Sequence, residues 1–435
     1  MDKDSNMSDF LLNKARAKLA IIGLGYVGLP LALAFGEKFK TVAFDISTSR
    51  IQELISGIDK TGETTTEDLL KVKNCRFTDE VGSLENCNTY IITVPTPIDK
   101  NNRPDLSFLS SATELVAKFL SVGDVVIFES TVYPGATEEV CVRLIEDASG
   151  LKFNNEFFVG YSPERINPGD KTHRLTDIVK VTSGSNDLCA SYVDDIYKSI
   201  IKAGTFKAKS IKIAEAAKVI ENTQRDVNIA LINELSILFQ KLDIDTKAVL
   251  DTAASKWNFL NFRPGLVGGH CIGVDPYYLT HKAQEVNHHP ELILAGRRLN
   301  DNMAKHISDT LMQEIIKNKS SLADFRILIM GITFKENCPD IRNTKVINIY
   351  NYFKNIGINA DVFDPCADAG DVEKELKITL QSDLTNSNYN AIIIAVAHDE
   401  FKSMNPDEII NFGTEDVIIY DLKHIMPDEA RCLRL

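Results

Sequence analysis

Residues 18–36 read KLAIIGLGYVGLPLALAFG, and the order of residue types in this segment indicates how the surrounding chain folds. A short apolar run ends in three closely spaced glycines, and a second apolar run follows them. In a strand–turn–helix unit, the first glycine permits a tight turn, the second lets backbone approach a pyrophosphate, and the third lets the helix pack on the strand. The segment therefore predicts a dinucleotide site at the start of a helix. The residues expected to line this site are Gly23, Gly25, Tyr26, Val27 and Gly28.

An acidic residue follows the next apolar run, which reads KTVAFD and ends at Asp45. It stands about twenty residues beyond the glycines, where an acidic side chain accepts a hydrogen bond from the 2′-hydroxyl of the adenine ribose. A carboxylate at this place repels a 2′-phosphate, so we expect NAD rather than NADP as the cofactor. Arg50 is close enough in sequence to join the same site. The alternative is a glycine-rich turn in an α/β domain that binds no nucleotide.

The same apolar run has a second interpretation as a targeting segment. Lys14, Arg16 and Lys18 precede it, as basic residues precede a secretory signal or a short membrane span. Four glycines and a proline within the run disfavour a continuous helix. We therefore expect neither a signal segment here nor a membrane partner.

The charge of the chain limits its partners. Among 435 residues, 61 are acidic and 48 are Lys or Arg, which gives a formal net charge of -13. Such a chain repels nucleic acids and anionic membrane surfaces, so we expect no nucleic-acid partner. An anionic ligand needs local help from basic side chains, backbone amides or helix N-termini.

The cysteine pattern indicates neither a disulfide framework nor a metal site. The eight cysteines are irregularly spaced without a C-x-x-C pair. His281, His288 and His289 have no accompanying acidic or cysteine ligand pattern. We therefore expect no bound metal, and a reducing, cytoplasmic location.

The apolar pattern changes twice along the chain. In the first 200 residues, apolar runs alternate with helical patterns, which is typical of a parallel sheet covered on both faces. Residues 210–242 contain neither Gly nor Pro and have helical spacing, and the alternation returns from about residue 325. The predicted fold class is α/β, with two doubly wound Rossmann-like domains joined by a central helical domain with a long helix. The expected boundaries are 1–203 for the NAD-binding domain, 204–308 for the central helical domain and 309–435 for the second Rossmann-like domain.

The long helical segment is apolar on more than one side, which is too much apolar surface for one small domain to cover. We therefore expect this helix to form the core of a homodimer. The two α/β segments also echo each other, because TVAFD ending at Asp45 resembles ADVFD ending at Asp364. The echo predicts two related domains, although any two such sheets could share it.

The segment Arg263–Pro276 reads RPGLVGGHCIGVDP and carries the strongest candidate for covalent chemistry. Its four glycines and two prolines exclude a regular helix, and glycines let backbone amides approach a ligand. Cys271 in such a loop is expected to face a substrate, and His270 and Lys218 are candidates to favour its thiolate. The alternative is a small buried cysteine in a tight turn.

Lys218 and Asn222 are polar side chains in the long apolar helical segment. Their spacing of four residues places them on one helix face. On spacing alone a solvated polar stripe is the simpler interpretation, and a pair of donors for a substrate is the functional alternative.

Seven motifs in order along nearly the whole chain resemble the UDP-glucose/GDP-mannose dehydrogenase family, and within it the branch that acts on UDP-N-acetylhexosamines. They are GLGYVGLPLA from Gly23, VPTP at 94–97, EST at 129–131, SPERINPG from Ser162, AKxxxN at 217–222, GGHCIGVDPYYL from Gly268 and GITFKENCPDIRN from Gly331.

The resemblance implies catalytic roles for the matching residues. Cys271 matches the family's nucleophile, and Asp275 matches the acidic residue four places later that helps to handle water and protons. Lys218 and Asn222 match the pair that steadies developing oxyanion charge. Glu164 matches a glutamate implicated in hydrolysis of the thioester.

The resemblance also implies binding roles. Thr131 matches a threonine near the cofactor and the catalytic water, and Thr96 belongs to the matching VPTP motif. Lys335 and Arg342 match a lysine near the substrate and an arginine near the cofactor phosphates, so the last domain is expected to bind the UDP-sugar. The expected substrate contacts are Glu164, Arg165, Lys218, Asn222, Arg263, Gly268, Gly269 and Lys335.

The implied reaction is the four-electron oxidation of the C6 alcohol of UDP-N-acetylglucosamine or UDP-N-acetylgalactosamine to the uronic acid, for bacterial surface polysaccharide. Four electrons require two NAD molecules. Cys271 is expected to hold the aldehyde as a thiohemiacetal and the acid as a thioester, which water releases.

Some positions depart from the family pattern. Val274 stands where UDP-glucose enzymes usually carry a lysine, and Gly273 stands where N-acetylmannosamine-type members often carry a proline. Trp257 takes the place of an arginine that reaches across the dimer in many members, so Arg263 is our candidate to balance the substrate's charge. The alternatives are a UDP-glucose 6-dehydrogenase, a two-electron hydroxyacid dehydrogenase without a nucleophilic cysteine, and a non-catalytic nucleotide-sugar sensor.

Overall fold

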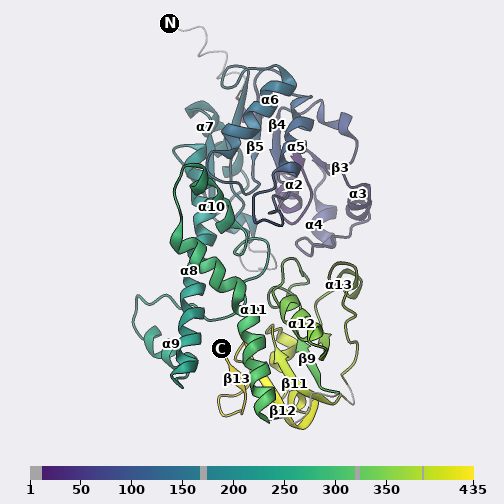
Figure 1. Ribbon diagram of the computed structural model, residues 1–435. Coiled ribbons are helices and arrows are strands. Elements are labelled where there is room, and N and C mark those ends of the chain that lie inside the picture. The colour runs from purple at the N-terminus through teal and green to yellow at the C-terminus, as the bar shows by residue number, and fades with distance from the viewer. Residues whose placement is uncertain (1–11, 167–173, 319–323, 385–386) are drawn as a thin grey trace. The chain divides into compact units, whose positions relative to one another are not determined.

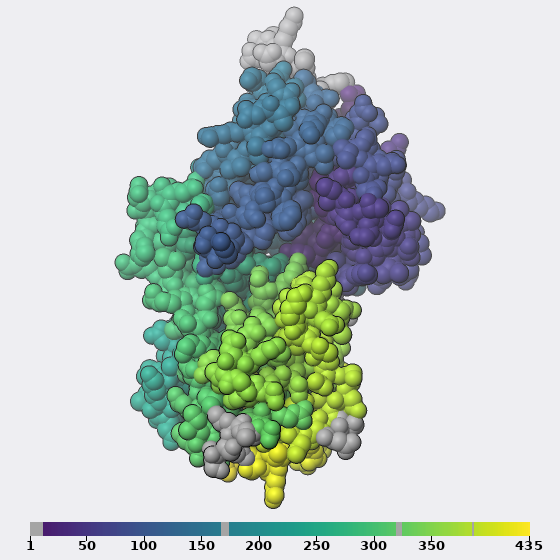
Figure 2. Space-filling model, turned by 45° about the vertical axis from the view of Figure 1, so that its right-hand side comes forward, coloured from purple at the N-terminus to yellow at the C-terminus, as the bar shows by residue number. Residues whose placement is uncertain are grey.

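The segment with the three glycines folds as its residue order predicts. Strand β1 (Lys18–Ile22) leads through the glycine turn into helix α2 (Gly28–Gly36). The computed structural model describes residues 12–166, 174–318, 324–384 and 387–435. The chain forms two units, one with the residues up to Glu221 and Tyr277–His288, the other with Asn222–Pro276 and the residues from His289 onward. In Figures 1 and 2 the colour runs by residue number, so the first unit is purple to teal apart from the green Tyr277–His288, and the second runs from teal to yellow.

The first unit contains an eight-stranded sheet in the order β3-β2-β1-β4-β5-β6-β7-β8. From β3 through β6 neighbouring strands pair in parallel, as predicted. The order reverses between β1 and β4, and ligands of such sheets bind beyond the carboxyl ends of the strands at this point. The further strands are β2 (Lys40–Phe44), β3 (Cys75–Thr78), β4 (Thr89–Ile92), β5 (Asp124–Phe128), β6 (Phe157–Tyr161), β7 (Lys180–Gly184) and β8 (Thr205–Lys207).

The first sheet departs from the predicted parallel pairing at its far edge. Strand β7 pairs antiparallel with β6, and β8 pairs in parallel with β7. A parallel neighbour needs a crossover connection, usually an α-helix. The described residues between β6 and β7 contain only the short helix η4 (Leu175–Asp177), so the chain turns back instead.

Helices cover the first sheet because its strands are apolar on both faces. Leu19, Ile21 and Ile127 belong to one core with side chains of α2 and α7, and α5 contacts β4 and α6. The helices of this unit are η1 (Lys14–Arg16), α3 (Thr48–Ile55), α4 (Thr66–Lys71), η2 (Val81–Leu84), α5 (Ser107–Ala117), η3 (Thr137–Cys141), α6 (Val142–Ser149) and α7 (Asp187–Lys198).

The predicted long helix is present as α8 (Ile211–Lys241), which is 31 residues long. It is followed by α9 (Thr246–Ala254), α10 (Asp275–Glu285) and α11 (Glu291–Asn318) (Figure 1). None of the helices in the described ranges has the length and apolar composition needed to cross a membrane.

The second unit contains a five-stranded parallel sheet in the order β10-β9-β11-β12-β13. Ile327 and Ile329 share a core with α11 and α12, whereas Leu328 and Met330 pack with α14 and α15 on the other face. The elements are β9 (Arg326–Met330), α12 (Val346–Asn355), β10 (Asn359–Phe363), α13 (Ala369–Leu376), β11 (Tyr389–Ile394), α14 (Asp399–Ser403), α15 (Pro406–Ile410), β12 (Gly413–Asp421) and β13 (Leu433–Arg434). The prediction of two doubly wound α/β sheets with a helical middle is thus confirmed.

The echo between the two α/β segments extends to backbone geometry. Gly23 and Gly331 have φ values of 96° and 94°, and their amides donate to the phenylalanine that ends the next strand at 2.9 and 2.8 Å. Asp45 and Asp364 directly follow that phenylalanine. Each accepts the amide of the residue after the glycine, at 2.7 and 2.6 Å. The two sheets therefore use one local construction.

Candidate functional site

The glycine turn after β1 has open space at Gly25. A Cβ on Gly28 would lie 1.8 Å from the carbonyl oxygen of Gly23, so the third glycine is required for α2 to pack on the turn. A Cβ on Gly25 would meet none of the described atoms within 4 Å. This space lies beside the N-terminus of α2, where backbone amides favour a pyrophosphate. The turn therefore fits the predicted dinucleotide.

Asp45 faces the same turn. Its Oδ2 accepts the amide of Leu24 at 2.7 Å and its Oδ1 accepts the amide of Ser47 at 2.9 Å. Each carboxylate oxygen can accept a further hydrogen bond, so the half-buried group retains acceptor capacity for a ribose hydroxyl. These residues fit NAD, and the negative charge disfavours a 2′-phosphate.

Two of the predicted cofactor residues meet beyond β4 and β5. The hydroxyl of Thr96 donates to the carbonyl oxygen of Thr131 at 2.6 Å. Tyr278 donates to the carbonyl of Thr96 at 2.7 Å. Thr93, at the end of β4, donates to the carbonyl of Gly23 at 2.7 Å, which ties this edge to the glycine turn. The carboxyl edge of the first sheet thus collects the predicted cofactor residues of the first unit.

Glu164 is a buried carboxylate held by its own loop. Its Oε1 accepts the amides of Arg165 and Ile166 at 2.6 and 2.5 Å. The Lys180 ammonium lies 3.5 Å from Oε2. The guanidinium of Arg165, a predicted substrate contact, is paired with Glu221 at 2.6 Å.

A buried charge network behind Glu164 was missed by the sequence reasoning. The Lys180 ammonium donates to Glu129 at 2.8 Å and to the carbonyl of Pro163 at 2.9 Å, and the Tyr197 hydroxyl donates to Glu129. Burial raises the pKa of Glu129 to about 7, although the Lys180 charge opposes that rise. A lysine at the start of a buried strand was the sequence signal that could have revealed the network.

Two of the predicted catalytic residues, Asn222 and Asp275, are in contact. The side-chain amide of Asn222 donates to Asp275 Oδ2 at 2.6 Å. On α8, Lys218 and Asn222 are only 7% and 8% exposed, which overturns the simpler interpretation of a solvated stripe. Buried polar side chains of this kind need polar partners, so both belong to a functional or structural polar cluster.

Cys271 lies in the irregular segment immediately before α10. Its carbonyl oxygen accepts the amides of Val274 and Asp275 at 3.1 and 2.9 Å, and its side chain is half-buried. Asn233 on α8 anchors the start of the segment, exchanging hydrogen bonds with the amide and carbonyl of Gly265 at 2.8 and 3.0 Å. The nucleophile candidate therefore sits on a loop that is fastened at both ends.

Gly268 and Gly269 are needed for packing. A Cβ on Gly269 would lie 2.8 Å from the Phe334 ring, and one on Gly268 would lie 3.0 Å from the carbonyl oxygen of Asn343. The absent side chains thus make room for residues 334–343 of the same unit, whereas the sequence reasoning assigned these glycines to the approach of a ligand. Their contact with substrate stays a prediction.

The other predicted basic residues of the second unit are in ion pairs or beside rings. Arg342 is paired with Asp340 at 2.6 Å, and despite burial, which raises the pKa of Asp340, Arg342 holds that pKa below its ordinary value. The Lys335 ammonium lies 5.6 Å from the centre of the Phe334 ring. Arg263 is exposed and pairs with Asp251 at 2.5 Å.

A second buried network, also missed, lies beneath the Cys271 loop. Arg297 on α11 donates to Asp226 on α8 at 2.6 Å, and the two side chains are 2% and 0% exposed. Asn300 donates to the same carboxylate at 2.8 Å. The guanidinium nitrogens of Arg297 would lie 3.9 Å from a Cβ on Gly273. This network therefore supports the loop from below.

Asp364, Cys366 and His398 form the one group of metal-type side chains found in the described residues. Asp364 accepts four backbone amides, and His398 Nδ1 accepts the amide of Asn337 at 3.0 Å. The other ring nitrogen lies 3.2 Å from Asp364. Because these lone pairs are already used, the cluster is a hydrogen-bonded counterpart of the Asp45 turn.

The predicted site residues divide between the two units. The first unit carries Gly23, Gly25, Tyr26, Val27, Gly28, Asp45, Arg50, Thr96, Thr131, Glu164, Arg165 and Lys218. The second unit carries Asn222, Arg263, Gly268, Gly269, Cys271, Asp275, Lys335 and Arg342.

Comparison with known proteins agrees with this architecture. Profiles of the UDP-glucose/GDP-mannose dehydrogenase family match residues 17–201 as the NAD binding domain, 212–302 as the central domain and 328–428 as the UDP binding domain. The chain is 55% identical to UDP-N-acetyl-D-glucosamine 6-dehydrogenase of Salmonella typhi, over 96% of this chain and 98% of that protein. It is 53% identical to Protein CapL of Staphylococcus aureus, over 94% and 96% of the two chains.

A solved structure gives the same result. The UDP-D-ManNAc dehydrogenase from Pyrococcus horikoshii superimposes with a TM-score of 0.86 at 30% identity, covering 96% of this chain and 98% of that chain. Both the sequence profiles and this superposition span the two units and the helical region between their sheets. The chain therefore belongs to the UDP-glucose/GDP-mannose dehydrogenase family and is an NAD-dependent nucleotide-sugar dehydrogenase.

Proposed function

We propose that this enzyme oxidises the C6 alcohol of a UDP-N-acetylhexosamine, with UDP-N-acetyl-D-glucosamine as the preferred sugar, to the uronic acid for surface polysaccharide. The observation that carries the proposal is 55% identity over 96% of the chain to proteins named for that reaction. The motif from Gly268 to Leu279 fits this proposal, because it contains Cys271 on an irregular loop that Asn233 anchors at Gly265.

Cys271 is proposed as the covalent nucleophile. Its thiolate adds to the carbonyl carbon of the aldehyde that the first oxidation forms, and the carbonyl oxygen takes up one proton to become the hydroxyl of a thiohemiacetal. NAD supplies the acceptor for one hydride in each of the two oxidations. The second oxidation removes a hydride from this carbon and a proton from its hydroxyl, which leaves Cys271 with a thioester. Attack by one water then breaks the carbon–sulfur bond and gives the carboxylate, the thiolate and two protons.

Charge that develops on oxygen during these steps needs fixed donors. We assign this role to Lys218 and Asn222. The Asn222 amide has two N–H groups, and Asp275 accepts one of them at 2.6 Å, which fixes the orientation of the amide. Asp275 is thus the orienting partner of Asn222 and the candidate for proton transfer.

Glu164 and Thr131 are proposed to serve the hydrolytic step. Glu164 is held by two backbone amides through one oxygen, which leaves the other oxygen beside Lys180 at 3.5 Å. A carboxylate fixed in this way is suited to orient water.

The predicted domains, 1–203, 204–308 and 309–435, then correspond to NAD binding, dimerisation with the catalytic loop, and UDP-sugar binding.

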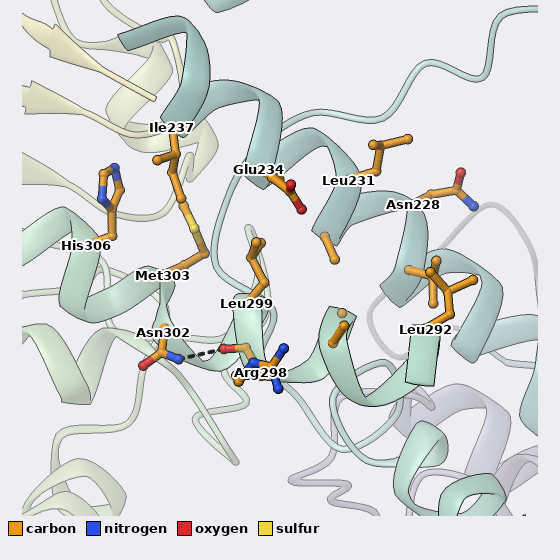
Figure 3. A pocket seen from close by; sticks show the side chains of 14 residues that line it. Asn228, Leu231, Glu234, Ile237, Leu292, Arg298, Leu299, Asn302, Met303 and His306 are labelled. Carbon is orange, nitrogen blue, oxygen red and sulfur yellow. Dashed lines mark hydrogen bonds between the residues drawn. The ribbon is translucent and has the colours of Figure 1, made fainter. Parts of the chain in front are cut away.

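A groove on α8 and α11 supports the proposed homodimer. Its volume is about 550 Å³, and Leu231, Ile237, Leu292 and Met303 line it (Figure 3). Leu231 and Leu292 are 56% and 70% exposed, and Leu238 lies two turns beyond Leu231 on α8. A second copy is the proposed occupant, because such apolar side chains along one helix face gain from burial in a two-fold interface.

The dimer proposal is tested by introducing a charge into the groove. Leu231→Glu is expected to give a particle near 48.4 kDa in light scattering at micromolar concentration, whereas the native chain is expected to give twice that mass. Leu188→Glu, at an exposed leucine of α7, is the matched control. A native chain that scatters as a monomer contradicts the proposal.

The free thiols of all eight cysteines fit the proposed cytoplasmic location.

The substrate proposal is tested with a panel of UDP-sugars. Formation of NADH is followed with UDP-N-acetylglucosamine, UDP-N-acetylgalactosamine and UDP-glucose at equal concentrations. The expected result is the highest kcat/KM with UDP-N-acetylglucosamine and two NADH per sugar consumed. A higher kcat/KM with UDP-glucose than with both N-acetylated sugars would overturn the substrate assignment while leaving the family intact.

A further inference from the structure

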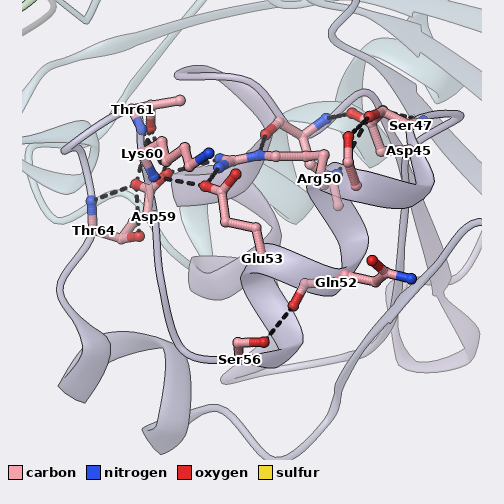
Figure 4. A network of polar contacts seen from close by, with 12 residues as sticks. Asp45, Ser47, Arg50, Gln52, Glu53, Ser56, Asp59, Lys60, Thr61 and Thr64 are labelled. Carbon is pink, nitrogen blue, oxygen red and sulfur yellow. Dashed lines mark hydrogen bonds and ion pairs between the residues drawn. The ribbon is translucent and has the colours of Figure 1, made fainter. Parts of the chain in front are cut away.

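Arg50 on α3 stands beside the turn that is built to receive the adenine ribose. Its Nε donates to the carbonyl of Leu24 at 2.9 Å, and the amide of Leu24 donates to Asp45 at 2.7 Å (Figure 4). Asp45 and Arg50 therefore flank one residue of the glycine turn. In related cofactor sites an arginine near the 2′-hydroxyl is the residue that accommodates the 2′-phosphate of NADP.

Two carboxylates bind the two terminal nitrogens of this guanidinium. Arg50 Nη1 donates to Glu53 at 2.5 Å and Nη2 donates to Asp59 at 2.8 Å. The three side chains are 12%, 14% and 0% exposed, so these ion pairs are shielded from water. Charge-assisted bonds of this kind are stronger than neutral ones. The guanidinium is thereby directed along α3 and away from service as a free anion-binding group.

Asp59 cannot follow Arg50 elsewhere, because its loop holds the carboxylate. Its Oδ1 accepts the amide of Thr61 at 3.0 Å, and its Oδ2 accepts the amide and hydroxyl of Thr64, each at 3.0 Å (Figure 4). Burial raises the pKa of Asp59, but hydrogen bonds from Arg50 and Thr61 outweigh burial and hold the pKa below its ordinary value. The group is thus a fixed negative charge under working conditions.

The local charge then opposes a phosphate. Asp45, Glu53 and Asp59 contribute three negative charges against the one positive charge of Arg50. We propose that Glu53 and Asp59 are specificity-determining residues for NAD against NADP, acting by retaining Arg50. Selectivity accordingly has two parts, repulsion of a 2′-phosphate by Asp45 and the withholding of Arg50 from that phosphate.

The test measures binding of the adenosine half of the cofactor. Isothermal titration calorimetry compares adenosine 2′,5′-bisphosphate with AMP on the full chain, independently of turnover. Asp45→Asn, which is nearly isosteric, removes the direct repulsion and is the reference background against which the further substitutions are measured. Adding Glu53→Gln and Asp59→Asn is expected to raise relative affinity for the bisphosphate at least tenfold.

A matched control separates release of Arg50 from general loss of negative charge. Adding Arg50→Met to the same variant is expected to remove the gain. The proposal is overturned if the gain survives this change, or if the folded triple variant shows no gain beyond that of Asp45→Asn alone. Should Asp59→Asn fail to fold by circular dichroism, Glu53→Gln in the Asp45→Asn background decides. In that variant a gain of at least threefold is expected, and no gain overturns the proposal.

Discussion

Two alanine substitutions in the glycine turn separate binding of NAD from packing of the fold. In Gly25→Ala the new Cβ meets none of the described atoms within 4 Å, so the unliganded protein is expected to melt at the native temperature. In Gly28→Ala the new Cβ would lie 1.8 Å from a backbone oxygen and 2.5 Å from the Thr93 hydroxyl. Overpacking of this kind costs about 1–3 kcal/mol, which lowers the melting temperature by about 2–12 °C.

The ligand-dependent part of the melting temperature gives the converse result. At a concentration one hundred times its dissociation constant, NAD stabilises the native chain by about 2.7 kcal/mol, or about 5–10 °C. If the added methyl of Gly25→Ala takes the space of the pyrophosphate and weakens binding about a hundredfold, the same NAD concentration gives only about 0.4 kcal/mol. Differential scanning fluorimetry with and without NAD measures both effects. A native NAD shift in Gly25→Ala would refute the placement of the pyrophosphate.

Three further predictions follow from buried groups. Because the folded state raises the pKa of Glu129 from 4.5 to about 7, mainly through burial, its stabilising contribution is complete below pH 4.5 and declines as pH rises to about 7. The decline is on the order of 3 kcal/mol. Denaturant midpoints of unfolding, measured from pH 4 to 8, should therefore fall more steeply with pH for the native chain than for Glu129→Gln. Equal slopes for the two proteins would contradict the assignment. Arg297→Met leaves the buried Asp226 carboxylate without its ion pair, so it should lower the free energy of unfolding by about 3–5 kcal/mol, and a loss under 1 kcal/mol in denaturant titration would count against the network. Asp275→Ala should reduce kcat far more than it changes KM, since it frees the Asn222 amide, and an unchanged kcat would remove Asp275 from the mechanism.

Local sequence was sufficient where neighbouring residues determine the structure. The β1–turn–α2 unit follows from glycine spacing, and α8 follows from a long run without Gly or Pro. The irregular Cys271 segment follows from its glycines and prolines. In each case the backbone preference is set within a few residues, so no tertiary contact had to be known.

Contacts between distant residues could not be read in the same way. Lys180 and Glu129 are 51 positions apart, and Asn222 and Asp275 are 53 apart, so their pairing depends on the order of strands and helices. Helical spacing alone left Lys218 and Asn222 as a solvated stripe, whereas burial shows otherwise. The reversal of β7 was hidden because an apolar strand reads alike in either direction.

The role of Gly268 and Gly269 shows the same limit. A glycine-rich loop is compatible with ligand approach and with close packing, and the sequence does not distinguish the two. The structure places Phe334 and Asn343 where side chains of these glycines would be. These two neighbours follow the glycines by 65 or more positions in the sequence, about half the length of a typical domain, so local sequence does not reveal them.

The covalent four-electron mechanism is tested most directly by Cys271→Ser. Serine is nearly isosteric, so the fold and NAD binding should survive, but its hydroxyl is far harder to ionise near neutral pH than a thiol. The measurement counts NADH formed per UDP-N-acetylglucosamine consumed and follows the uronic acid by mass spectrometry. The native enzyme is expected to give two NADH per sugar, and Cys271→Ser is expected to give no uronic acid above traces. A Cys271→Ser protein that still forms two NADH and one uronic acid per sugar at near-native rate would contradict the covalent role of Cys271.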